Sequence, residues 1–75
     1  MCSVSMIMDH YQKTLPTWPK LPEHYIEDRL HEMKSLLEVA RQYDREHNQP
    51  DCELDSKRLA LKALAKELGI EISFL

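Results

Sequence analysis

The sequence predicts an all-α protein built on an antiparallel helical hairpin, and three observations support this fold class. Apolar residues in the long helix expected at residues 23–47 recur at steps of three and four, the period of one face of an amphipathic helix; they are Ile26, Leu30, Met33, Leu37 and Ala40. A second stretch with helical spacing covers residues 55–68. Only seven residues connect the two stretches, and a connection this short favours antiparallel neighbours.

Length and composition describe one small domain. The chain has 75 residues and a net charge of −3, with 13 acidic and 10 basic residues, which argues against nucleic-acid binding driven by counterion release. No apolar run approaches the roughly 18 residues of a membrane span, and the amino terminus lacks the basic and apolar regions of a secretion signal. We therefore expect a cytoplasmic protein that gains stability from a partner or from self-association, because a core of this size is marginal alone.

The first expected element is a short helix near residues 5–13, within an amino-terminal unit of residues 1–13. Tyr11 lies four residues after Ile7 and three after Met8, so the three share one helical face. Ser3 and Ser5 can each cap this helix. Alternating apolar residues at 4, 6 and 8 leave a strand as the competing interpretation.

Residues 14–22 are expected to form an extended proline strap. Its three prolines fall at every third residue, the period of the polyproline II helix; they are Pro16, Pro19 and Pro22. The apolar residues on one edge of the strap are Leu15, Trp18 and Leu21. This edge either covers the long helix from within or docks as a PxxP ligand in a partner's aromatic groove. The internal strap is favoured, since a small domain needs its one tryptophan for its own core.

Both ends of the long helix carry signals. Pro22 suits the first turn, while Arg45 and His47 suit the last turn before Pro50 prevents continuation. Leu36, Val39 and Tyr43 join the apolar seam in the second half. The wider seam implies a second neighbour in addition to the hairpin partner. Polar side chains on the opposite side are expected to face solvent: Glu27, His31, Lys34, Glu38, Arg41 and Arg45.

The second helix completes the predicted hairpin of residues 23–68, and a tail of residues 70–75 follows it. Asp55 or Ser56 can cap the helix, Gly69 ends it, and Ile70 is expected to fold back onto the last turn. Its expected buried face contains Leu61, Leu64, Ala65 and Leu68. The tail alternates apolar and polar residues like a strand. Three alternatives remain open for it: pairing with residues 2–8, pairing with a second copy, or packing against the hairpin.

Residues with metal-binding or catalytic chemistry form no motif. Asp28 and His31 have the carboxylate-x-x-His spacing of bundle metal sites, and His24 and Glu27 share their face, but this row is expected to be solvated. The two cysteines, Cys2 and Cys52, lack zinc-site spacing. The basic face of the second helix, with Lys57, Arg58, Lys62 and Lys66, is expected to face solvent. We expect no catalytic residue, cofactor or metal, and therefore no enzyme.

The segments MCSVSMIMDHYQK and YDREHNQPDCE resemble small uncharacterised bacteriophage proteins. The resemblance implies a viral source, hence the host cytoplasm or the virion as location, and assigns no functional residue. The leading hypothesis is a non-catalytic interaction protein that acts as an oligomer or as a subunit of a larger assembly such as a virion. The residues expected to meet the partner are Leu15, Trp18, Leu21, Ile26, Leu30 and Met33. The alternatives are an inhibitor or adaptor of a host protein, and a metal, thiol or nucleic-acid-binding module.

Overall fold

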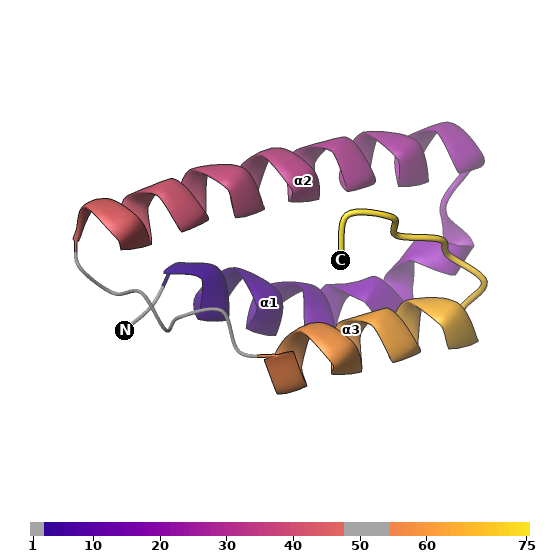
Figure 1. Ribbon diagram of the computed structural model, residues 1–75. Coiled ribbons are helices and arrows are strands. Elements are labelled where there is room, and N and C mark those ends of the chain that lie inside the picture. The colour runs from indigo at the N-terminus through magenta and orange to yellow at the C-terminus, as the bar shows by residue number, and fades with distance from the viewer. Residues whose placement is uncertain (1–2, 48–54) are drawn as a thin grey trace.

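The computed structural model describes residues 3–47 and 55–75, and within these ranges the chain is all-helical, as predicted. Three α-helices and one 3-10 helix follow in order: α1 (Ser3–Thr14), η1 (Leu15–Lys20), α2 (Glu23–Glu46) and α3 (Asp55–Glu67). Figure 1 shows α2 running antiparallel to both α1 and α3. No helix among the described residues is long and apolar enough to cross a membrane.

Helix α1 is the centre of the fold, because it packs against α2, α3 and η1. Its buried residues Val4, Met8 and Tyr11 lie at steps of four and three, so the helix interpretation of this segment is confirmed and the strand alternative is wrong. The predicted hairpin, in which α3 lies directly along α2, is not confirmed: α1 is the main neighbour of α2. Two amphipathic helices joined by a short connection can each bury their apolar face against a third helix, and here they do so.

The proline segment forms the 3-10 helix η1 rather than the predicted extended strap. Both conformations have three residues per turn and accept the fixed φ of proline, so a spacing of three cannot distinguish them. The expected consequence holds nevertheless: Leu15 and Trp18 are buried in the core. Trp18 meets Tyr11 edge to face, with ring centroids 5.9 Å apart. Leu21 then returns to extended backbone (φ −89°, ψ 151°) before Pro22 and α2.

Helix α2 matches the predicted residues 23–47 to within one residue. Pro22 is its N-cap, and His47 is its C-cap, with a backbone N–H that bonds the Tyr43 carbonyl at 3.1 Å. The predicted stop signal Pro50 lies outside the described residues. Residues facing the core follow the predicted seam; the fully buried ones are Met33, Leu37 and Ala40.

Helix α3 ends in the predicted glycine turn. Gly69 has φ 74°, its N–H bonds the Lys66 carbonyl at 3.1 Å, and the Ile70 N–H bonds the Ala65 carbonyl at 2.8 Å. These two bonds define a Schellman motif, which reverses the chain. Leu61 and Ala65 are buried as expected, whereas Leu64 and Leu68 are half-buried.

The tail, residues 70–75, forms no strand within the described residues, and pairing with residues 2–8 is wrong because residues 3–8 belong to α1. The apolar side chains of the tail pack into the core, with Ile70, Ile72 and Leu75 buried, and residues 73–74 form a turn. The third alternative, packing against the hairpin, is not confirmed, because the hairpin itself is not. Figure 1 shows the tail passing between α2 and α3. Arg58 on α3 fixes its end by donating from Nη1 to the Leu75 carbonyl oxygen at 2.6 Å.

Candidate functional site

The six residues predicted to meet a partner mostly serve the core of the single chain. Leu15, Trp18 and Met33 are buried, with at most 3% of their surface exposed. The other three pack half-buried at the edge of the core: Leu21, Ile26 and Leu30. A partner could touch the buried three only if the core opened. A contact role therefore has to be sought among the apolar side chains that the fold leaves exposed.

Three of the exposed apolar side chains lie together on α2. Leu36, Val39 and Tyr43 are 40%, 67% and 49% exposed. Their spacing of three and four residues places them on one face of the helix, and we call this set the α2 stripe. The sequence signal was the widening of the seam in the second half of the long helix. It implied a second neighbour, and no described element of the chain covers the stripe.

The α2 stripe borders a shallow depression of about 350 Å³. Val39 and Tyr43 supply its apolar floor, and Glu38, Gln42 and Glu46 supply its polar rim. The Tyr43 ring is stacked on His47 with centroids 3.9 Å apart, and His47 Nδ1 lies 2.8 Å from the Tyr43 carbonyl oxygen. The aromatic end of the stripe is therefore held in place, which lowers the entropic cost of a contact there.

Asp44 is the one buried charged residue among those that the structure describes, at 3% exposed. Its carboxylate accepts from the Ser3 N–H at 3.0 Å and from the Val4 N–H at 3.1 Å. Burial alone would raise the pKa of Asp44, but the hydrogen bonds from Val4 and Ser3 outweigh it and the pKa is lowered. Because Ser3 and Val4 begin α1, their N–H groups have no partner within the helix. The Asp44 side chain thus caps the amino terminus of α1 from the neighbouring helix α2, and its lowered pKa has a structural cause.

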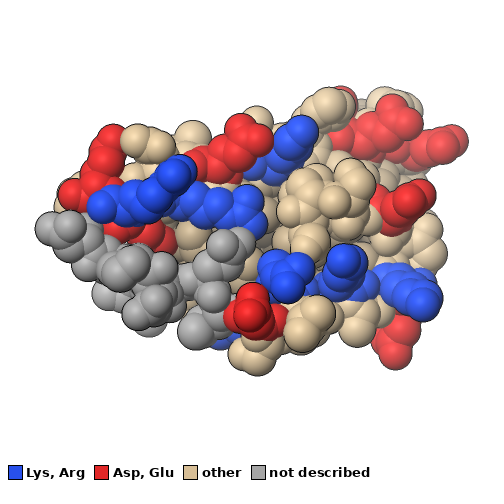
Figure 2. Space-filling view, viewed as in Figure 1, with Lys and Arg blue, Asp and Glu red and all other residues tan. Residues whose placement is uncertain are grey.

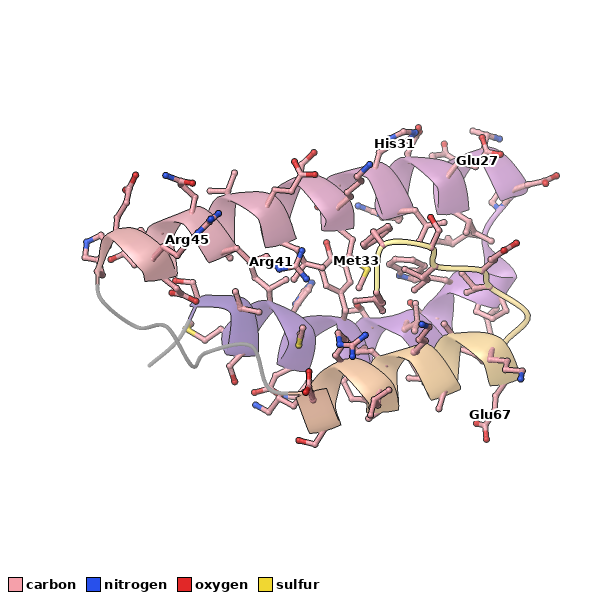
Figure 3. The ribbon with its side chains drawn as sticks, in the orientation of Figure 1. Glu27, His31, Met33, Arg41, Arg45 and Glu67 are labelled. Carbon is pink, nitrogen blue, oxygen red and sulfur yellow. The ribbon has the colours of Figure 1, made fainter. Side chains whose placement is uncertain are left out.

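The row of possible metal ligands on α2 is exposed. Figure 3 shows Glu27 and His31 pointing away from the bundle, whereas Met33 points into it. No group of three or more histidine, cysteine or acidic side chains within residues 3–47 and 55–75 is placed to hold a metal ion. The predictions made for Cys2 and Cys52 lie outside the described residues.

A second depression, of about 330 Å³, lies where α1 and η1 meet α2. It brings Tyr11 and His10 together with Arg29 and Glu32. Burial raises the pKa of Tyr11, and the charge of Glu32 adds to this effect while that of Arg29 opposes it. The hydroxyl of Tyr11 therefore stays protonated at neutral pH and can act as a hydrogen-bond donor. No hydrogen bond joins it to a base among the described residues, so the geometry does not supply an acid–base pair.

Basic side chains follow α3, as Figure 2 shows. Lys57 is committed to α1: its Nζ lies 2.7 Å from Ser5 Oγ and 2.9 Å from Asp9 Oδ1. Lys62 and Lys66 form no ion pair with any described residue and border a groove of about 470 Å³ beside the tail. The basic face that was predicted to be solvated is therefore divided. Lys57 bridges α3 and α1, whereas Lys62 and Lys66 form no ion pair with a described residue.

Comparison with known proteins gives no match. No protein-family model, no curated protein and no solved structure is similar to the chain. The functional interpretation therefore depends on the surfaces described above. Of these, the α2 stripe combines an apolar centre with a polar rim, the arrangement that protein–protein interfaces share.

Proposed function

We propose that this chain is a small non-catalytic protein that acts by protein–protein contact, as an oligomer or as a subunit of a larger assembly such as a virion. The observation that supports this function is the α2 stripe, an exposed apolar face on a helix whose other apolar face is already covered by α1. If the chain is viral, as the resemblance to phage proteins implies, the host cytoplasm or the virion is the place of action.

The stripe differs from ordinary surface leucines by being continuous. Single exposed apolar residues are normal on soluble proteins, whereas adjoining ones with a polar rim mark contact sites. Leu36 and Tyr43 are seven residues apart, which is about 10 Å along a helix. Covering each square ångström of such apolar surface contributes about 25 cal/mol. The centre of the stripe is Val39, the most exposed large apolar residue among those described.

The size of the stripe determines the kind of contact. Stable interfaces cover about 800 Å² on each partner, or 20 to 30 residues, and three side chains supply only part of that. A dimer closed by the stripe alone would dissociate readily. A role in a larger assembly, where several small contacts act together, suits this surface better than an obligate dimer does.

A second candidate, an adaptor or inhibitor that binds a host protein, is favoured by the charge of the rim. The depression beside the stripe is bordered by Glu38 and Glu46, with no lysine or arginine among its lining residues. A second copy placed directly opposite would bring like charges together. A partner with a basic rim would meet the acidic groups with opposite charge, which favours encounter and specificity.

Light scattering on size-separated protein tests the leading proposal. The mass should exceed the 8.9 kDa of one chain or rise with concentration in the micromolar range, and Val39→Glu should return it to one chain. Leu59→Glu is the matched control, because Leu59 is 55% exposed on α3 and receives the same charge change. Circular dichroism checks that both variants keep their helices.

A single-chain mass at every concentration would refute self-association through the stripe, and so would an equal effect of the two variants. Retention of one stoichiometric host protein by the parent chain and by Leu59→Glu, but not by Val39→Glu, would establish the second candidate instead. Loss of that protein from both variants would exclude the α2 stripe as its binding site.

A further inference from the structure

The exposed face of α2 carries a regular row of residues that contains the α2 stripe and continues beyond it in both directions. The row advances by three and four residues in alternation, the spacing of the contact positions of a coiled coil. All its members are exposed, and Figure 1 shows α2 at the edge of the bundle, with the other elements on one side of it. We call this set the outer row: Arg29, Glu32, Leu36, Val39, Tyr43 and Glu46.

The middle of the outer row is the apolar α2 stripe, and its two ends are charged. Arg29 and Glu32 lie at the amino-terminal end, 3.6 Å apart between Nη1 and Oε2, with side chains that are 54% and 56% exposed. At the other end, Glu46 accepts a hydrogen bond from Gln42 Nε2 at 2.9 Å and forms no ion pair with a described residue. One end of the row therefore carries a cation, and the other end carries an acid without a counter-charge.

The order of these charges determines how a second copy can lie on the row. A parallel copy would place Arg29 opposite Arg29 and Glu46 opposite Glu46, which brings like charges together. An antiparallel copy, with the two-fold axis between residues 37 and 38, places Arg29 opposite Glu46 and Leu36 opposite Val39. Two-fold symmetry repeats each contact, because the same surface is used by both copies. The antiparallel pair therefore has an apolar centre and an ion pair at each end.

The remaining two positions of the row are also complementary in this arrangement. Tyr43 lies opposite Glu32, and a phenol hydroxyl can donate a hydrogen bond to a carboxylate. The Tyr43 ring is already held by its stacking on His47, with centroids 3.9 Å apart. The contact therefore does not have to order this side chain, which lowers the cost of binding.

Other antiparallel registers lack this complementarity. A shift of one heptad in one direction places Arg29 opposite Val39 and Glu32 opposite Leu36. The same shift in the other direction places Glu46 opposite Leu36. Each of these pairings covers a charge with an aliphatic side chain and gives it no partner, which is unfavourable. Polar residues at contact positions select register in coiled coils in this way.

We propose that a second copy of this chain covers the outer row in the antiparallel register that places Arg29 opposite Glu46. This inference rests on the proposed function, because it names the partner of the α2 stripe. Arg29 and Glu46 are 17 residues apart, which is about 26 Å along a helix. The contact is longer than that of the stripe alone but remains a single pair of helices, so the dimer dissociates reversibly in the micromolar range.

Sedimentation equilibrium of the full chain and its charge variants tests the register. Arg29→Glu and Glu46→Arg should each weaken the dimer about tenfold or more, because two symmetric attractions become repulsions. The double variant Arg29→Glu with Glu46→Arg should restore the affinity to within about threefold of the parent chain. A parallel pair would show neither the loss nor the rescue, because like residues would face each other in every variant.

The matched control is Lys34→Glu, which makes the same charge change as Arg29→Glu at an exposed residue of α2 outside the outer row. It should leave the affinity within about twofold, because exposed charges distant from a contact are screened by salt. Circular dichroism checks that every variant keeps its helices.

Disulfide cross-linking provides an independent measurement of the register. Two chains are mixed, one with Arg29→Cys and one with Glu46→Cys, and both carry Cys2→Ser and Cys52→Ser. Their mixed dimer keeps one Arg29–Glu46 pair, and the two new cysteines should form a disulfide on oxidation. Neither chain alone should cross-link, because like positions are then about 26 Å apart and a disulfide needs Cα atoms within about 7 Å.

The results separate the inference from the proposed function. Dissociation by Val39→Glu without any effect of the charge reversals, or cross-linking between like positions, would overturn the register and leave association through the α2 stripe standing. An equal loss of affinity with Lys34→Glu would also overturn the register. A single-chain mass at every micromolar concentration would overturn both the inference and self-association through the stripe.

Discussion

Leu36 and Leu37 are adjacent on α2 and have opposite surroundings, so truncating each to alanine tests which face of the helix is buried. Leu37 is 0% exposed in the core, whereas Leu36 is 40% exposed on the α2 stripe. Both substitutions remove the same atoms from the same turn, and the change in helix propensity is equal. Any difference in unfolding free energy between the two variants therefore reports the surroundings of the side chain.

The expected magnitudes differ by severalfold. Leu37→Ala leaves a cavity in a filled core, and such a change costs about 2 to 5 kcal/mol. A domain of this size is stable by roughly 4 to 11 kcal/mol, at about 0.05 to 0.15 kcal/mol per residue. Leu37→Ala therefore removes a large part of the total stability. Leu36 is already partly exposed to solvent, so Leu36→Ala removes little buried apolar surface. It should lower the free energy of unfolding by less than about 1 kcal/mol.

Urea unfolding followed by tryptophan fluorescence measures both losses, because Trp18 is the sole tryptophan and is buried. With a slope near 1 kcal/mol per molar urea, Leu37→Ala should lower the midpoint by about 2 M or more and Leu36→Ala by less than about 1 M. Equal losses at the two positions would refute the assigned face of α2. A Leu36→Ala loss that grows with protein concentration would indicate association through the stripe, since association stabilises the folded state by mass action.

Two further predictions concern Asp44 and Gly69. The pKa of Asp44 is lowered in the folded chain, so the stabilisation by its carboxylate is present above the unfolded pKa, near 4. That stabilisation is lost as the pH falls through the lower folded pKa. An acid titration monitored by circular dichroism should show a smaller loss for Asp44→Asn, and identical acid profiles would contradict the capping role. At Gly69, φ is 74° and an added Cβ would meet no atom within 4 Å, so Gly69→Ala should cost about 1 to 2 kcal/mol through backbone strain alone. Gly69→Asn should cost less in thermal unfolding, because asparagine tolerates this conformation; equal melting temperatures for the two variants would refute the strain argument.

The helices were predictable because their ends and their periods are local properties of the chain. Gly69 followed by Ile70 specified a Schellman motif, which the hydrogen bonds to Lys66 and Ala65 confirm. The conformation of the proline segment was not predictable from its period, since the 3-10 and polyproline II helices both repeat every three residues. Burial of Leu15 and Trp18 was predictable in either case. Residues three apart lie on the same side of a 3-10 helix and of a polyproline II helix.

The neighbours of each helix were harder to predict, because an apolar face does not specify what covers it. The seam of α2 was paired with residues 55–68 on the basis of a short connection, whereas α1 covers it instead. One signal for this arrangement was present in the sequence. Asp44 continues the seam of Met33, Leu37 and Ala40 at a step of four, and an acid on a buried face needs donors. The free N–H groups at the start of another helix are such donors.

The same uncertainty explains why the predicted contact residues were largely core residues. An apolar residue of a small chain can be buried in its own core or against a partner. The helical spacing of apolar residues is the same in both cases, so it does not distinguish them. Leu15, Trp18 and Met33 go to the core because α1 and η1 fold against α2 and bring enough apolar surface to enclose them. Of the large apolar side chains that the core leaves exposed, three form the α2 stripe.

The division of surfaces has a physical consequence for how such a chain can act. Since α1, η1 and the tail together close the core, the buried apolar residues are covered within one copy. The depression beside the α2 stripe is bordered by Glu38 and Glu46, whereas Lys62 and Lys66 border a separate groove beside the tail. If the chain acts by contact, as we propose, these two surfaces of opposite charge would favour partners of different charge.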